Sequence, residues 1–134
     1  MRVPTALPIY AWVAIGSGGG SVLRYAAGWV APAEATWGWP LATLGVNVLG
    51  SCFIGFFAAM VGPDGRWLVS PAVRQGVMVG LCGGLTTFSA FSLEGVLLLH
   101  VGELLETFSY VLVSLIGWLA AAWLGHAAAL RLIR

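Results

Sequence analysis

The chain contains no lysine, and charged residues of all kinds make up only 8% of its 134 residues. Its formal net charge is +1 at pH 7, so it has no basic patch that could neutralise phosphates. This argues against a nucleic-acid partner. Apolar residues, in contrast, make up 60% of the chain, and the mean hydropathy is +0.95. Soluble domains carry about 25% charged residues, so the composition indicates a membrane protein that lies in a lipid bilayer.

Cysteine and histidine are also scarce, which narrows the chemistry open to the chain. Cys52 and Cys82 both lie within apolar runs, and we interpret them as small buried hydrophobic residues. Together with His100 and His126, they form no spacing typical of a nucleophile and its base or of a metal site. We therefore expect no catalytic residue and no enzyme activity.

Four apolar runs are long enough to cross a bilayer, since each crossing takes roughly 20 helical residues. Short segments rich in turn formers or charge separate them. The sequence therefore predicts an all-α membrane protein, with residues 1–134 forming one domain and both termini on one side of the membrane. The predicted transmembrane helices cover residues 7–29, 40–61, 71–99 and 107–130.

The arginines are unevenly divided between the two ends of these helices. Arg24 lies alone at one end, and the others lie on the side of the termini, which favours a cytoplasmic location for the termini. These others are Arg2, Arg66, Arg74, Arg131 and Arg134.

Small residues recur at four-residue spacing in the first and third runs. Gly16 and Gly20 follow this spacing in the first run, as do Gly76, Gly80 and Gly84 in the third. Because such spacing lets helix backbones approach closely, we interpret these glycines as packing positions.

The third run holds the most unusual segment, Gly83-Gly84-Leu85-Thr86-Thr87-Phe88-Ser89-Ala90-Phe91-Ser92-Leu93-Glu94. Hydroxyls and a carboxylate are tolerated at membrane depth only where protein buries them or water runs beside them. We therefore interpret this segment as the functional core. Its glycines and β-branched threonines predict a helix break. Glu94 is either a buried, hydrogen-bonded acid or an interfacial residue.

A helix break could serve ions of either sign. Freed backbone carbonyls can hold a cation such as sodium, as in discontinuous transporter helices. The amides at the start of the following helix would face a nearby anion.

Polar side chains also line one face of the second and fourth runs. Asn47 has two interpretations, either a clasp between helices or a donor into a pore. The hydroxyl stripes also have a second interpretation, because such stripes in membrane helices often serve only to hold helices together. The stripes are Thr43, Asn47 and Ser51 in the second run, and Thr107, Tyr110 and Ser114 in the fourth.

A lining of neutral donors suits an anion that must be stripped of water without being trapped. Phe88 and Phe91 stand three residues apart, and an aromatic ring presents a positive edge that could help to coordinate a small anion. Core packing is the other interpretation of these two rings.

Three motifs resemble those of the small bacterial fluoride channels of the Fluc/CrcB type. Gly16-Ser17-Gly18-Gly19-Gly20-Ser21-Val22-Leu23-Arg24-Tyr25 resembles the glycine-rich first helix of that family. Thr43-Leu44-Gly45-Val46-Asn47-Val48-Leu49-Gly50-Ser51-Cys52-Phe53-Ile54-Gly55 resembles its second helix around a pore asparagine. Gly83-Gly84-Leu85-Thr86-Thr87-Phe88-Ser89-Ala90-Phe91-Ser92 resembles its third-helix break, the most diagnostic of the three.

This resemblance implies an antiparallel, dual-topology homodimer of four-helix subunits in the bacterial inner (plasma) membrane. Two fluoride pores would let cytoplasmic fluoride leave passively and protect the cell from its toxicity. The arginine bias is in tension with dual topology, because such a dimer needs equal insertion both ways.

The resemblance also implies roles for individual residues. Asn47 would orient a pore donor with Thr43 on the same face, and Arg24 would serve an aqueous vestibule. Phe88 and Phe91 would line the ion path edge-on, and Tyr110 and Ser114 would form a polar track. The carbonyls of Gly83 and Thr86 would bind a structural sodium ion (Na+) at the dimer interface. Thr87, Ser89 and Glu94 complete the set of candidate pore residues.

One departure from the family pattern concerns the fourth helix. Trp118 occupies the next turn of its hydroxyl stripe, so we expect a shorter polar track than in relatives. Two other functions remain open. A small four-helix multidrug exporter would need an acid in its first helix, and residues 7–29 contain none. A structural membrane subunit without transport activity would leave the hydroxyl stripes without a purpose.

Overall fold

A computed structural model describes residues 6–31 and 39–134, and every regular element in these ranges is helical. The predicted all-α class is therefore confirmed for the described residues, and Arg2 lies outside them. The elements are α1 (Ala6–Val30), α2 (Leu41–Met60), α3 (Pro71–Gln75), the π-helical stretch η1 (Gly76–Cys82), α4 (Gly83–Leu85), α5 (Phe88–His100) and α6 (Leu104–Ile133).

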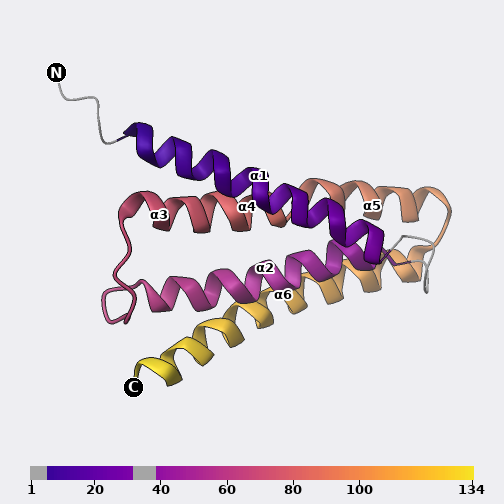
Figure 1. The fold of residues 1–134 in the computed structure, drawn as a ribbon. Helices are drawn as coiled ribbons and strands as arrows, with labels where there is room; N and C mark the ends of the chain where they lie inside the picture. The colour runs from indigo at the N-terminus through magenta and orange to yellow at the C-terminus, as the bar shows by residue number, and fades with distance from the viewer. Residues whose placement is uncertain (1–5, 32–38) are drawn as a thin grey trace.

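The helices lie alongside one another as long rods (Figure 1). α3, η1, α4 and α5 follow one another along a single rod, α2 packs mainly on α6, and α1 packs on η1 and α4. The start of α1, the end of α6 and the connection from α2 to α3 all lie at one end of the molecule. The turn from α5 to α6 lies at the opposite end.

Three helical segments in the described ranges are long and apolar enough to cross a membrane. They are Leu41–Met60, Pro71–His100 and Leu104–Ile133. α1 has 25 residues and would be long enough, but it is not among the three. A membrane crossing by α1 therefore stays a prediction.

Local sequence explains where several helices begin and end. Ser70 caps α3 by accepting a hydrogen bond from the Val73 amide at 3.3 Å, and Pro71 takes the first helical position. Gly102 turns the chain between α5 and α6 with a φ of 85°, a conformation that side chains rarely tolerate. α6 extends beyond the predicted residues 107–130 at both ends because Glu106, Arg131 and their neighbours favour the helix.

Glycines bring α1 unusually close to η1 and α4. A β-carbon on Gly16 would overlap the Gly76 carbonyl oxygen, and one on Gly20 would overlap the Leu81 carbonyl oxygen. On the opposite side of the contact, a β-carbon on Gly84 would overlap the carbonyl oxygen of Ser17. The interpretation of these glycines as packing positions is confirmed.

Two alanine substitutions in α1 test this close approach. Gly16→Ala should lower the free energy of unfolding by about 1–3 kcal/mol, because η1 must move to admit the methyl group. At Gly19, nothing lies within 4 Å of the position that a β-carbon would take. Gly19→Ala should therefore leave stability unchanged or raise it by up to about 1 kcal/mol. Thermal unfolding of the detergent-solubilised protein measures both, and equal midpoints would contradict the proposed packing.

Candidate functional site

The centre of the site is a pair of hydrogen bonds between the Asn47 side chain and the backbone of Thr87. The Thr87 amide donates to Asn47 Oδ1 at 2.7 Å, and Asn47 Nδ2 donates to the Thr87 carbonyl at 2.9 Å. Asn47 is only 4% exposed, so both ends of its amide need partners. These contacts support the clasp interpretation of Asn47. Because Nδ2 carries a second hydrogen, a role as pore donor remains compatible with them.

Thr86 and Thr87 interrupt the helical path between α4 and α5. Their φ, ψ angles are −82°, 157° and −151°, 127°, which are extended conformations. Thr86 donates its hydroxyl to the Cys82 carbonyl at 2.9 Å, and Thr87 caps α5 by accepting from the Ala90 amide at 3.2 Å. The two glycines at 83 and 84 stay helical, so the extended residues are the threonines that follow them.

The extended residues change which backbone carbonyls have partners. In a continuous α-helix the Thr87 amide would bond to the Gly83 carbonyl, but here it bonds to Asn47. The Thr86 carbonyl accepts a hydrogen bond from Arg24 Nη1 at 3.1 Å. Gly83 therefore fits the predicted sodium site, whereas at Thr86 the arginine's positive charge would oppose a cation. Within the described ranges no cluster of three or more His, Cys, Asp or Glu residues could hold a metal ion.

Glu94 accepts hydrogen bonds from two helices at once. The Thr43 hydroxyl on α2 donates to Oε1 at 2.6 Å, and the Tyr110 hydroxyl on α6 donates to Oε2 at 2.8 Å. Thr43 and Tyr110 are 8% and 0% exposed. Of the two interpretations of Glu94, these two contacts support the hydrogen-bonded acid.

Phe88 and Phe91 are placed very differently, although they lie on neighbouring turns. Phe88 is 67% exposed and Phe91 only 5%. The Phe91 ring centroid lies 5.5 Å from that of Phe88, 5.3 Å from that of Tyr110 and 4.8 Å from that of Trp118. Phe91 is therefore the centre of an aromatic cluster, while Phe88 lies at its open side.

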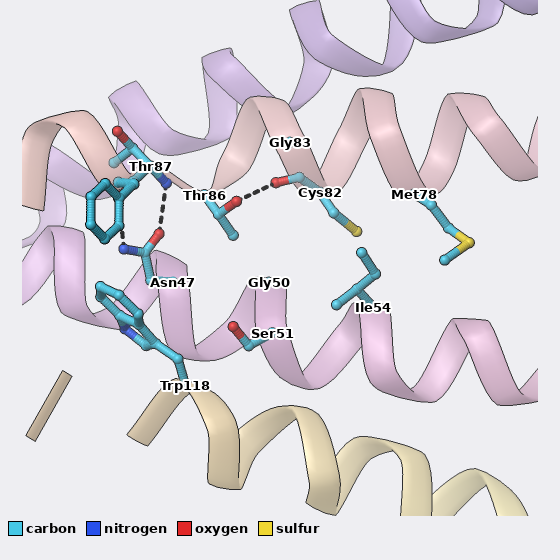
Figure 2. Close-up of a pocket in the computed structure, with 11 residues that line it drawn as sticks. Asn47, Gly50, Ser51, Ile54, Met78, Cys82, Gly83, Thr86, Thr87 and Trp118 are labelled. Carbon is cyan, nitrogen blue, oxygen red and sulfur yellow. Dashed lines mark hydrogen bonds between the residues drawn. The ribbon is translucent and has the colours of Figure 1, made fainter. Parts of the chain in front are cut away.

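Two cavities flank the clasp. The first, of about 470 Å³, lies between α2, the η1–α4 rod and α6 (Figure 2). The second, of about 460 Å³, is lined by residues of α1, α2 and α5. Thr87 lines both. Polar groups of the first are Asn47, Ser51, Thr86 and Thr87, and those of the second are Arg24, Thr43, Thr87 and Glu94.

The predicted site residues do not all reach these cavities. Gly83 and Phe88 line the first cavity, but Ser89, Phe91, Tyr110 and Ser114 line neither. Ser89 is exposed and lies 3.2 Å from the Thr87 hydroxyl oxygen. Trp118 lines the first cavity and was not among the predicted site residues. Its position four residues after Ser114 was the available signal, because that spacing places both on one helix face.

The described residues form only helices, several of them candidate membrane spans with cavities between them, which is the arrangement of a multi-pass membrane protein. The chain belongs to the CrcB family, because residues 11–126 match the family described as CrcB-like protein, Camphor Resistance (CrcB). The family resemblance predicted from the three motifs is therefore confirmed.

Related proteins match over nearly their full length. A protein of Bradyrhizobium diazoefficiens named fluoride-specific ion channel FluC 1 is 49% identical over 123 residues, covering 92% of this chain and 85% of the relative. The protein of the same name from Rhodopseudomonas palustris is 49% identical over 126 residues, covering 94% and 89%. The fluoride-specific ion channel FluC of Opitutus terrae is 43% identical, covering 94% and 96%.

Removing the clasp should destabilise the protein. Asn47→Ala leaves the part-buried Thr87 amide and carbonyl without their partner, which should cost about 1–3 kcal/mol of unfolding free energy. Ser51→Ala, one turn further along the same helix, is the matched control and should change the thermal midpoint little. Equal midpoints for the two detergent-solubilised variants would contradict a structural role for Asn47.

Proposed function

We propose that this protein is a fluoride-selective ion channel that lets cytoplasmic fluoride leave the cell passively and so protects it from fluoride. The relatives named as fluoride-specific ion channels align with at least nine-tenths of this chain. The observation that carries the proposal is the clasp between Asn47 and Thr87, because Thr87 lines two cavities whose walls each hold polar groups within otherwise apolar helices. Such a polar arrangement in hydrocarbon favours an ion path over simple packing.

The proposed path begins in the second cavity and ends in the first. Arg24 supplies a positive charge where the anion enters, and the amide and hydroxyl groups near Thr87 then offer neutral donors. Neutral donors replace the water of a small anion without holding it too long. Asn47, whose second Nδ2 hydrogen is not used in the clasp, would be one such donor.

The two phenylalanines would act at the first cavity. Phe88 lines this cavity, and Phe91 packs behind it, with ring centroids 5.5 Å apart. Ring edges carry a partial positive charge, so an anion passing beside Phe88 would be stabilised without a formal charge. Ser89 would add a hydroxyl at the mouth, near Thr87.

The protein would work as an antiparallel homodimer with two pores. The first cavity is open in a single chain, and lipid covering its polar wall would leave Ser51 and Thr86 facing hydrocarbon. A second copy would cover that wall. Arg66 lies between α2 and α3, Arg74 lies in α3, and Arg131 lies in the last turn of α6. These segments lie at one end of the molecule, so opposite orientations of the two copies would balance their charge.

Each subunit would cross the bacterial inner membrane four times. α1 would form the first crossing, since it has 25 residues and packs along η1 and α4. The segment Pro71–His100 would form the third, with its helix broken at Thr86 and Thr87. The freed Gly83 carbonyl would bind sodium at the dimer interface, and Thr86 would join it only where Arg24 releases the Thr86 carbonyl.

Fluoride efflux from liposomes tests the channel function. Liposomes that contain the purified protein should lose fluoride rapidly and chloride slowly, as followed by ion-selective electrodes. Phe88→Ile keeps apolar volume but removes the ring edge, so it should slow fluoride loss by about tenfold, the equivalent of about 1.4 kcal/mol. Leu93→Ile, at another exposed position of α5, is the control. Folded protein that releases no fluoride would instead support a structural subunit without transport activity.

The molar mass of the purified protein in detergent tests the assembly and its sodium ion. In sodium chloride the protein should have twice the mass of one chain. In N-methylglucamine chloride, whose cation is too large for a carbonyl site, the dimer should dissociate or unfold at a lower temperature. A single-chain mass in sodium chloride would overturn the dimer, and a dimer equally stable in both salts would overturn the sodium site.

A further inference from the structure

A groove between α2 and α6 lies apart from the two cavities beside the clasp. It has a volume of about 580 Å³, and residues of these two helices alone line it. Arg131 is its one charged lining residue. Its large apolar side chains are Leu49, Phe53, Phe56, Trp123 and Leu124.

Small residues give this groove its depth. A β-carbon on Gly125 would overlap the Cys52 carbonyl oxygen, and one on Gly55 would overlap the Ala122 carbonyl oxygen. The backbones of α2 and α6 therefore nearly touch, and Ala128 adds only a methyl group to the lining. Because this contact fixes the two backbones relative to each other, the groove is a built feature of the helix pair.

The groove faces away from the first cavity. Successive residues of an α-helix are turned by about 100°, so Leu49 in the groove lies about 200° around α2 from Asn47 in the first cavity. On α6, Ala127 in the groove lies about two and a half turns after Trp118 in the first cavity, which is the opposite side. A second copy covering the first cavity would leave the groove facing lipid.

Arg131 places a positive charge at one end of the groove. It lies in the last turn of α6, one turn after Ala127 and on the same face, and its side chain is exposed. The connection from α2 to α3 lies at the same end of the molecule (Figure 1). Residues 61–75 and 129–134 hold four arginines and one acid, which are Arg66, Arg74, Arg131, Arg134 and Asp64. This excess of positive charge attracts anions.

The groove has the size for the upper part of a lipid chain. From Trp123 to Arg131 it follows α6 for about 12 Å, at about 1.5 Å per residue. One leaflet of a bilayer has a hydrocarbon depth of about 15 Å. An acyl chain is flexible and needs no hydrogen bonds, so leucine, phenylalanine and tryptophan walls suit it through van der Waals contact.

The charge selects the headgroup. A phosphate pairs with a guanidinium through two parallel hydrogen bonds. The choline group of phosphatidylcholine would bring a second positive charge to an end that already holds several arginines. The glycerol group of phosphatidylglycerol carries no charge, so the headgroup of this lipid stays anionic.

We propose that this groove binds one anionic phospholipid, with an acyl chain along α2 and α6 and the phosphate at Arg131. The bound lipid supports the helix pair that places Asn47 and Trp118 at the first cavity. The site does not depend on the proposed channel function, because lipid binding is measured without ion flow.

Native mass spectrometry tests the lipid and the role of Arg131. The purified protein is equilibrated in detergent with equal amounts of palmitoyl-oleoyl phosphatidylglycerol and palmitoyl-oleoyl phosphatidylcholine. The first lipid that the wild-type protein retains should be mainly phosphatidylglycerol, and equal retention of the two lipids would overturn the site. Arg131→Gln should reduce the preference about fivefold, because one basic residue at a lipid surface contributes about 1 kcal/mol.

The control for charge is Arg134→Gln. This variant removes the same charge at the same end of the molecule, from a residue that does not line the groove. It should reduce the preference for phosphatidylglycerol much less than Arg131→Gln does. Equal reductions would indicate a diffuse attraction to the arginine-rich end and overturn the site.

Filling the groove tests the place of the acyl chain. Ala128→Leu puts a larger side chain into the groove and should abolish most retention of either lipid, with the mass of the assembly unchanged. Ala120→Leu, at an exposed position of α6 outside the groove lining, is the control and should retain lipid as the wild type does. Wild-type retention by Ala128→Leu would overturn the site.

Two further outcomes separate the alternatives. If Ala128→Leu alone reduces a two-chain assembly to a single chain, a second copy occupies the groove and the lipid site is overturned. If the protein retains phosphatidylglycerol as expected but conducts no fluoride, the channel function alone is overturned.

Discussion

The arrangement of this site depends on the two hydrogen bonds between Asn47 and the backbone of Thr87. In a membrane, each backbone amide and carbonyl must find a partner within the protein. Two extended residues inside an apolar rod remove helical hydrogen bonds, and a side-chain amide is able to replace one donor and one acceptor together. Without Asn47 the Thr87 amide and carbonyl would lose these hydrogen-bond partners, and a continuous helix would be favoured over the extended conformation of Thr86 and Thr87.

The close packing of α1 against η1 and α4 adds a further contact to the same site. Because Gly16 and Gly20 have no side chains, α1 lies against η1 and α4 with backbones nearly touching. This approach brings Arg24, one turn beyond Gly20, within 3.1 Å of the Thr86 carbonyl. The glycine spacing thus serves more than packing, since it delivers a guanidinium to a carbonyl that the extended backbone exposes.

The sequence was sufficient to predict the helices and the polar segment, but not the pairing of side chains. The length of an apolar run locates a helix because the thickness of the bilayer sets how many residues a crossing takes. Glycine spacing indicates a helix–helix contact because only small residues let two helix backbones approach closely. The bond from Tyr110 to Glu94 joins two helices, so it depends on how each is rotated, which periodicity within one helix does not determine. The π-helical winding of Gly76–Cys82 likewise has no local signal, since the same residues suit an α-helix.

Charge balance explains how the second cavity could admit an anion without trapping it. Arg24 and Glu94 both line this cavity, yet the guanidinium bonds to the Thr86 carbonyl and the carboxylate bonds to the Thr43 and Tyr110 hydroxyls. Charged groups in a medium of low dielectric constant need hydrogen-bond partners. Here an uncharged carbonyl and two uncharged hydroxyls are these partners. In the proposed path, the opposite charges would act together on an entering ion. The attraction of Arg24 would be offset by the repulsion of an ionised Glu94, which would leave the ion free to continue toward the clasp.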